Sequence, residues 1–459
     1  MRNIHIDADL LRRYDQPGPR YTSYPTAVEF HEGFTASDYA NRLSVFGGKQ
    51  CISLYIHLPF CEHRCSFCGC NVVVTRKREV AARYLSYLER EMALVREHLQ
   101  GKPTVLQYHW GGGTPTYFTP EQLGRLHETV QKYFHILPDA ERAVEVDPKV
   151  TTKEHIDLLA DLGFNRLSMG IQDFTPAVQA AIQRNQDETA TRELYEYCRE
   201  RGFTAINFDL IYGLPEQTHA GFERNLASVL MMRPDRVALY SYAHVPWAKG
   251  HQKRIDTSRL PAAETKFELF ARAIRAFQTS GYRQIGMDHF ALPEDELSCA
   301  LEHRRLRRNF MGYTVHRTPN LIGLGLSAIG EVCGSYVQNA KKLSAYYRAL
   351  DEGKLPVERG YILDRDDRIR RQVVTALMCN GYLHLGEIER CYGVRFREYF
   401  VRELEALARG PVEDGLLEIE DDALVATPVG KLFIRNICMV FDSYLERKKE
   451  DSAVFSRTI

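Results

Sequence analysis

The sequence predicts an α/β fold, an incomplete (β/α)6 barrel with an N-terminal arm and a small, mainly helical C-terminal domain. From about residue 50 onward, short runs rich in β-branched and aromatic residues alternate with longer segments whose apolar residues recur at helical spacing. Such strict alternation implies parallel strands joined by right-handed crossovers. Because six such units follow one another, an open barrel is favoured over a doubly wound sheet.

The strand predictions rest on six short runs. They are ISLYIHL at 52–58, TVLQYHW at 104–110, RAVEVD at 142–147, NRLSMGI at 165–171, AINFDLIYG at 205–213 and RVALYSYAH at 236–244. Amphipathic helices are predicted between them, for example at 78–98 and 120–134. Barrel enzymes keep their sites at the carboxyl ends of the strands, so polar residues at those ends are candidates for function.

The two ends of the chain differ from the barrel. Residues 1–50 are predicted to form an irregular arm that covers the active site, because GPRYTSYPT at 18–26 is too rich in Pro, Gly, Ser and Thr for a core element. Residues 51–360 would form the barrel with its extensions. Residues 361–459 show two helical segments, a short hairpin and another helix, which predicts a winged-helix-like domain. Balanced charge favours a structural or substrate-covering role for this domain over DNA binding.

The composition narrows the class of protein. Lys plus Arg and Asp plus Glu both number 60 in 459 residues, and this zero net charge weighs against nucleic acid as a partner. We find neither a secretory signal nor any run approaching the ~20 apolar residues of a membrane span. We therefore expect a cytoplasmic protein, with a monomer preferred. In that reducing compartment, an odd number of cysteines indicates metal or redox chemistry rather than disulfides.

A dense group of cysteines follows the first predicted strand. CEHRCSFCGC at 61–70 holds four of the eleven cysteines. The CxxxCxxC spacing of Cys61, Cys65 and Cys68 allows one short loop to bind a [4Fe–4S] cluster through three thiolates, with one iron left open for chemistry. The alternative is a zinc site that also uses Cys70, but zinc sites usually come as two CxxC pairs with a longer spacer. The spacing favours the cluster.

A run of glycines follows the second predicted strand, in HWGGGTPT at 109–116. Three consecutive glycines remove every side chain from a loop, so the polar end of a ligand can meet backbone amide and carbonyl groups directly. The loop is not a phosphate loop, since the GxxxxGK pattern is absent. Its position beside the cysteine loop makes it a candidate for cofactor binding.

Together the two motifs resemble those of the radical S-adenosylmethionine (radical SAM) enzymes. The resemblance extends along the whole chain to the oxygen-independent coproporphyrinogen III oxidases. It is carried by GPRYTSYPT, YIHLPFCxxxCxFCGC, HWGGGTPT, EVDP, NRLSMGIQDF, DLIYGLP and RNICMVFD. The arm, the fourth cysteine and RNICMVFD are the parts that distinguish the oxidases from their relatives.

The resemblance implies a reaction of haem biosynthesis, in which two propionates of coproporphyrinogen III become the vinyl groups of protoporphyrinogen IX with loss of carbon dioxide. No acid–base side chain can break the unactivated C–H bond, so a cofactor must carry the chemistry. The implied cofactors are one [4Fe–4S] cluster with an open iron and two molecules of S-adenosylmethionine, whose reductive cleavage gives a 5′-deoxyadenosyl radical. The implied partner is a one-electron reductant such as flavodoxin or ferredoxin.

The resemblance also assigns contacts to S-adenosylmethionine. They are Tyr55, Phe67, Gly112, Gly113, Thr114, Glu145, Gln172, Arg184, Asp209, Ala243 and Ile329. Glu145 and Asp209 stand out from the residues as well, because an acid among apolar strand residues is costly to bury unless it is paired. Arg184 is expected to grip a carboxylate of the cofactor. Ala243 and Ile329 carry no chemistry of their own.

The arm offers candidates for the substrate site. Coproporphyrinogen III carries four carboxylates, so a basic and partly aromatic pocket is expected, with Arg20, Tyr21 and Tyr24 as its candidates. An arm that closes over the barrel mouth would also exclude water and oxidants from a radical.

Two alternatives remain open. Haem-binding relatives in the same superfamily act as haem chaperones, and they carry an HNxxYW segment near the end of the barrel. Here the corresponding stretch is RRNFMGYT at 307–314, with Arg308 in place of His and Thr314 in place of Trp, which favours the oxidase. A zinc-stabilised interaction protein would need Cys70 as a ligand and would leave the glycine run unexplained. We therefore place Cys70 near the active site, with an auxiliary catalytic role, and outside the cluster ligands.

Overall fold

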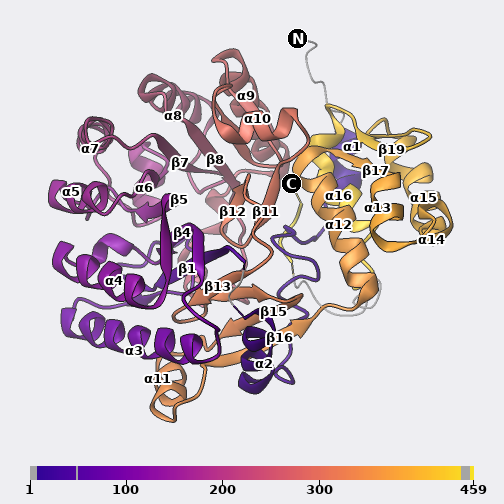
Figure 1. Ribbon diagram of the computed structural model, residues 1–459. Helices are drawn as coiled ribbons and strands as arrows, with labels where there is room; N and C mark the ends of the chain where they lie inside the picture. Colours follow the sequence, from indigo (N-terminus) through magenta and orange to yellow (C-terminus); the bar gives the residue numbers. More distant parts are fainter. Residues whose placement is uncertain (1–7, 48–49, 446–454, 459) are drawn as a thin grey trace.

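A twelve-stranded mixed sheet forms the centre of the molecule (Figure 1). The computed structural model describes residues 8–47, 50–445 and 455–458. Six parallel strands lie side by side in chain order: β1 (Ile52–Leu58), β4 (Thr104–Gly112), β5 (His135–Val146), β6 (Arg166–Gln172), β7 (Ala205–Tyr212) and β8 (Arg236–Ser241). The sheet ends at two different strands and is therefore open, which confirms the partial (β/α)6 barrel.

Helices cover the outer side of this curved sheet (Figure 1). They are α3 (Arg78–Glu97), α4 (Pro120–Tyr133), α5 (Lys153–Asp161), α6 (Pro176–Ala181), α7 (Glu188–Glu200), α8 (His219–Met232) and α9 (Ala263–Thr279). In the part of the chain that the structure describes, no helix is long and apolar enough to cross a membrane.

Alternation along each strand separates the core from the barrel interior. In β1, Ile52, Leu54 and Ile56 are fully buried in the main hydrophobic core. In β5, Val144 and Val146 belong to the same core, whereas Glu145 between them lines cavities in the interior. One face of these strands therefore builds the hydrophobic core, and the polar residues on the other face point into the barrel interior.

Short strands that the sequence did not reveal extend the sheet at both ends. On the β1 side these are β13 (Leu321–Leu324), which is parallel to β1, and then β14 (Ile329–Val332), β15 (Ser335–Asn339) and β16 (Val357–Ile362). On the β8 side they are β10 (His289–Ala291) and β9 (Arg283–Ile285). A separate hairpin, β11 (Arg307–Asn309) and β12 (Gly312–Thr314), follows α10 (Glu296–Glu302), and α11 (Leu343–Asp351) precedes β16.

The N-terminal segment is less irregular than expected. It contains α1 (Ala8–Tyr14) and α2 (Ala36–Phe46), and α2 begins with a capping box in which Thr35 and Asp38 exchange hydrogen bonds. Tyr39, Leu43 and Phe46 of α2 are part of the barrel core. The prediction of one irregular arm over residues 1–50 is therefore wrong for α2, whose helical spacing of apolar residues was outweighed by the neighbouring turn residues.

The C-terminal domain is mainly helical, as predicted. Its elements are α12 (Arg365–Asn380), β17 (Tyr382–His384), α13 (Leu385–Tyr392), α14 (Phe396–Tyr399), α15 (Val401–Leu407), β18 (Leu417–Ile419), β19 (Ala423–Ala426) and α16 (Ile434–Met439). The hairpin β18–β19 pairs with β17 in a three-stranded sheet. The winged-helix-like arrangement stays a prediction.

The arm packs on this C-terminal domain. Tyr14, Tyr21 and Tyr24 are buried in its core cluster. The Tyr21 hydroxyl donates to Asp442 at 2.9 Å, and the Tyr24 hydroxyl lies 3.1 Å from that of Ser443. The two terminal motifs named above, 18–26 and 435–442, therefore meet in space.

One buried arginine holds the two termini together. The Arg435 guanidinium is 5% exposed and donates to the backbone carbonyl oxygens of Gly18, Pro19, Arg457 and Thr458. This one side chain therefore satisfies carbonyl acceptors from both ends of the chain. The position of the arm depends on this residue.

We therefore predict that Arg435→Ala destabilises the protein by about 3 kcal/mol, because several buried carbonyl groups lose their donor at once. Urea unfolding followed by circular dichroism measures the change. Arg397→Ala is the matched control, since Arg397 also donates to two backbone carbonyls, of Glu420 and Asp421, but is exposed. Its expected cost is below about 0.5 kcal/mol. Equal losses in both variants would contradict the role given to Arg435.

Candidate active site

The cysteine loop lies at the carboxyl end of β1 and is closed at its base by a pair of short strands. β2 (Phe60–Cys61) pairs with β3 (Val73–Val74) in parallel. The Val73 N–H donates to the Pro59 carbonyl at 2.8 Å, and the Thr75 N–H donates to the Cys61 carbonyl at 3.1 Å. Both ends of the loop are therefore fixed, whatever the loop binds.

A second set of contacts fixes the middle of the loop. His251 Nε2 lies 2.8 Å from the Cys68 carbonyl oxygen. The buried Gln252 donates from its side-chain amide to the carbonyls of Phe67 and Ala243, at 3.1 and 3.2 Å. These two residues were not predicted from the sequence. A polar residue in a short turn carries no sign of the distant backbone that it binds.

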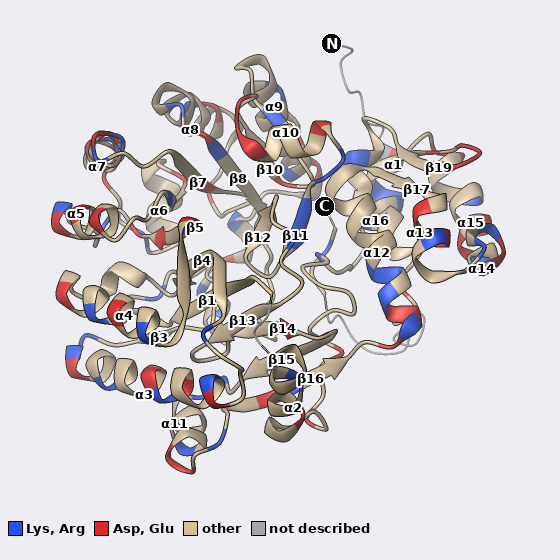
Figure 2. Ribbon diagram, viewed as in Figure 1, with Lys and Arg blue, Asp and Glu red and all other residues tan. Residues whose placement is uncertain are grey.

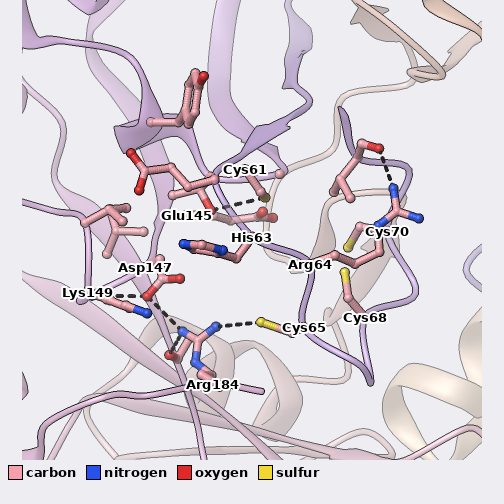
Figure 3. Close-up of a pocket in the computed structure, with 18 of the residues that line it drawn as sticks. Cys61, His63, Arg64, Cys65, Cys68, Cys70, Glu145, Asp147, Lys149 and Arg184 are labelled. Atoms are coloured by element: carbon pink, nitrogen blue, oxygen red, sulfur yellow. Dashed lines mark hydrogen bonds and ion pairs between the residues drawn. The ribbon is translucent and has the colours of Figure 1, made fainter. Parts of the chain in front are cut away.

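The cysteines line one cavity of about 220 Å³ (Figure 3). Cys61, Cys65, Cys68 and Cys70 all belong to its wall. The other predicted residues in the wall are Phe67, Gly112, Gly113, Thr114, Glu145, Gln172, Arg184 and Asp209. The structure thus brings together residues that lie in or just after β1, β4, β5, β6 and β7.

The thiols have partners from the other strand ends. The Thr114 hydroxyl lies 3.5 Å from Cys61 Sγ, and Arg184 Nη1 lies 3.7 Å from Cys65 Sγ. The thiols of Cys68 and Cys70 lie close together, and their interaction lowers the pKa of Cys68 to about 6 and raises that of Cys70. Among the described residues, no three His, Cys, Asp or Glu side chains converge as a single metal ion would require. An iron–sulfur cluster does not need such convergence, because each thiolate binds a different iron.

The glycine run lets two loops approach each other closely. A side chain at Gly113 would lie 2.6 Å from the Pro59 backbone, and one at Gly112 would lie 2.5 Å from the His57 ring. Gly112 also has φ +118°, which side chains rarely allow. Its N–H donates to Glu145 at 3.0 Å. The glycines therefore keep the base of the cysteine loop against β4.

The Glu145 side chain lies in the cavity wall in its ionised form. Its side chain is 43% exposed, and its other oxygen lies 3.3 Å from His109 Nε2. Burial opposes ionisation, but the hydrogen bonds from His109 and Gly112 and the nearby histidine charge hold the pKa of Glu145 below its usual value. A carboxylate that is ionised and partly open suits a cationic or hydroxyl-bearing ligand.

Asp209 faces the same space from β7. Ser168 and Asn207 each donate a hydrogen bond to it at 2.8 Å. Burial, together with the neighbouring Glu145 carboxylate, raises the pKa of Asp209 to about 6. A cation placed between the two acids would relieve this repulsion.

Arg184 and Gln172 form the far wall of the cavity. The Arg184 guanidinium is 8% exposed and donates to Asp147, Gly170 and Gln186 at 3.0, 2.6 and 3.0 Å. It is therefore fixed in place beside Cys65 and is not a solvated surface charge. Gln172 has φ +67° at a register shift of β6, a strained conformation that is typical of functional sites.

Three predicted contacts lie outside the cavity wall. The Tyr55 hydroxyl is 2.9 Å from His57 Nδ1, on the inner face of β1. The Ala243 carbonyl accepts a hydrogen bond from Gln252, which also donates to the Phe67 carbonyl of the cysteine loop. Ile329 lies in β14 and packs against a satellite hydrophobic cluster. Contact of these residues with S-adenosylmethionine stays a prediction.

Comparison with known proteins gives the class and the family. Residues 55–229 match the model of the Radical SAM superfamily, and residues 363–433 match that of the HemN C-terminal domain. Oxygen-independent coproporphyrinogen III oxidase of Salmonella typhimurium is 43% identical over 459 residues, covering 100% of this chain and 99% of that protein. The protein of that name from Escherichia coli is 43% identical over 460 residues, covering 100% of both chains.

A solved structure agrees. Coproporphyrinogen III oxidase (HemN) from Escherichia coli, described as a radical SAM enzyme, matches with a TM-score of 0.91 and 41% identity, over 96% of this chain and 100% of that one. A cysteine-lined cavity at the carboxyl ends of parallel barrel strands, with the superfamily match, defines this chain as a radical SAM protein that binds a [4Fe–4S] cluster and S-adenosylmethionine. Its full-length identity shows that it belongs to the family of oxygen-independent coproporphyrinogen III oxidases.

We predict that Gly113→Ala weakens S-adenosylmethionine binding by about tenfold or more, because the added methyl group must displace the Pro59 and Phe60 backbone at the base of the cysteine loop. Equilibrium dialysis with the cluster-loaded protein measures the affinity. Gly124→Ala in α4 is the control, since its methyl group would make only an ordinary contact of 3.8 Å. If Gly113→Ala bound as tightly as Gly124→Ala, the close approach of the two loops would not matter.

Proposed function

We propose that this protein converts two propionate side chains of coproporphyrinogen III to the vinyl groups of protoporphyrinogen IX without oxygen. The observation that carries the proposal is the common cavity of the three cysteine thiols, the glycine loop and the two acids, in a chain that resembles named oxidases over its full length. When bound, the cluster and S-adenosylmethionine supply the one-electron chemistry that removes hydrogen from an unactivated C–H bond.

The residues of the cavity fit that pair of groups. Cys61, Cys65 and Cys68 would hold the cluster. Gly112, Gly113 and Thr114 would line the methionine or ribose end of S-adenosylmethionine, and Glu145 and Asp209 would offer carboxylates to its hydroxyl groups and positive charge. Phe67, Gln172 and Arg184 complete the wall. Tyr55, Ala243 and Ile329 are part of the proposal on resemblance alone, as is a second molecule of S-adenosylmethionine.

A further cavity lies beside this one in the barrel, and we propose that it takes one edge of the substrate. This second cavity, of about 150 Å³, shares Glu145, Ser168 and Asp209 with the first. Tyr240 lines it, and the Arg20 guanidinium from the arm lies 5.7 Å from the centre of that ring. We propose that Arg20 meets a carboxylate of the substrate at this end of the barrel, where the arm limits access of water.

The other two candidates in the arm have different surroundings. Tyr21 and Tyr24 are buried, and their hydroxyl groups bind Asp442 and Ser443. These contacts fix the arm on the C-terminal domain, so the two tyrosines are left out of the proposed substrate site.

Haem chaperone activity is the weaker candidate. Arg308, at the position where those relatives carry His, donates to the Arg20 carbonyl at 3.1 Å and lies 5.0 Å from the centre of the Tyr313 ring. It has no lone pair for an iron and instead supports the arm.

Several features remain proposals. We propose a cytoplasmic monomer that takes its electron from flavodoxin or ferredoxin, and a division of the chain at about residues 50 and 360. Cys70 would act beside the cluster without binding it, since its thiol lies next to that of Cys68.

One anaerobic assay tests the function. Protein reconstituted with iron and sulfide is given S-adenosylmethionine, dithionite and coproporphyrinogen III, and 5′-deoxyadenosine and porphyrinogen products are measured by chromatography. We expect both products, and we expect neither from Cys65→Ala, which lacks one thiolate. Cleavage of the cofactor without decarboxylation, combined with tight haem binding, would instead favour the chaperone, and protein that takes up zinc but no cluster would contradict both.

A further inference from the structure

The cysteine loop reaches the protein surface at its tip. Gly69 is exposed, and a side chain there would meet nothing within 4 Å. Arg64 is exposed on the same loop, and Figure 3 shows it beside Cys70 and Cys68. A cluster held by this loop would therefore lie close to solvent on one side, and its other side would face the cavity.

Two stretches of the sequence without any acid meet at this loop. Residues 63–78 contain four Lys or Arg and no Asp or Glu, and the same is true of residues 236–255. Acid-free stretches of this length are unusual in a chain that carries equal numbers of acidic and basic residues. On the outer helices, by contrast, acidic and basic residues are interspersed (Figure 2).

Arg78 pairs with Glu62, and Arg236 pairs with Asp295 and Glu296. The structure brings three other charges of these stretches, those of Arg64, Lys249 and Arg254, to one place near the cysteine loop. His251, which binds the Cys68 carbonyl, lies at its centre. Burial and the neighbouring positive charges of Arg64, Lys249 and Arg254 lower the pKa of His251. Lys253 and Arg254 are exposed. In the same acid-free stretch, the Trp247 side chain is 58% exposed, which is unusual for so large an apolar group.

We propose that Arg64, Trp247, Lys249, Lys253 and Arg254, here called the basic face, dock a one-electron carrier protein with an acidic surface around its redox centre. The inference rests on the proposed function, which needs a source of single electrons. One electron passes from the reduced carrier to the oxidised cluster, so the carrier is oxidised by one electron and the cluster reduced by one. No atom is transferred.

The chemistry of the basic face suits such a partner. Opposite charges steer two proteins together and orient them, and a transient complex needs only a small interface. The exposed Trp247, two residues before Lys249 in the sequence, supplies an apolar contact of the kind on which binding energy concentrates. The hydrogen bond between His251 and the Cys68 carbonyl links this segment to a cysteine of the loop, so a carrier docked here would lie on the cluster side of the barrel.

The test compares two double variants of equal charge. Lys253→Glu with Arg254→Glu changes the basic face, and Arg224→Glu with Arg275→Glu changes exposed residues on the outer helices α8 and α9. For each cluster-loaded protein we measure the affinity for oxidised flavodoxin by isothermal titration calorimetry at two salt concentrations. Product formation is measured with reduced flavodoxin and, separately, with dithionite.

We expect the change on the basic face to weaken flavodoxin binding by about tenfold or more and to flatten its salt dependence, while turnover with dithionite stays at the level of the unaltered protein. Trp247→Ala should weaken binding at both salt concentrations. Unchanged affinity, or an equal loss in the control variant, would overturn the proposal. So would stronger binding to a second copy of the chain or to RNA than to flavodoxin. Absence of turnover with dithionite in every protein would instead contradict the proposed function.

Discussion

The site depends on one constraint: a short loop with three thiols must keep its shape at the carboxyl end of β1 while its sulfur atoms face a ligand. Backbone hydrogen bonds from Val73 and Thr75 close its base, and His251 and Gln252 hold its middle. These contacts use the loop backbone, so the thiols stay available for iron. The glycines after β4 are needed for the same reason, because any side chain at Gly113 would push this base away.

The remainder of the molecule supports this arrangement from two sides. Strands β5 and β7 place Glu145 and Asp209 around the loop, and alternation along these strands keeps their neighbours in the core. Arg184, which follows α6, lies beside them. On the other side, the arm and the C-terminal domain are held together by Arg435 and by the buried tyrosines. The arm then presents Arg20 to the barrel interior, which links the ends of the chain to the substrate side of the site.

The sequence predicted the barrel well because its strands and helices have strong periodicity and its motifs sit at strand ends. It predicted poorly where contacts are long-range. β5 begins at His135, before the predicted residue 142, because its first half pairs with β4 before a register shift. The short strands β13–β16 carry too few residues for a pattern. Nothing local marks Gln252 or Arg435, since each is defined by backbone carbonyls far away in the sequence. The prediction that Ala243 and Ile329 contact S-adenosylmethionine came from the resemblance alone, because their side chains carry no polar group that would indicate it.

The central claim is that three thiolates hold the cluster and leave its fourth iron for S-adenosylmethionine, with Cys70 outside the ligand set. Electron–nuclear double resonance of the reduced cluster with S-adenosylmethionine labelled with ¹⁵N at the amino group or ¹⁷O at the carboxylate tests it most directly. Coupling of both labels to the cluster is expected in the unaltered protein and in Cys70→Ser. Absence of coupling in the unaltered protein, or loss of the cluster in Cys70→Ser, would show instead that Cys70 occupies the fourth iron.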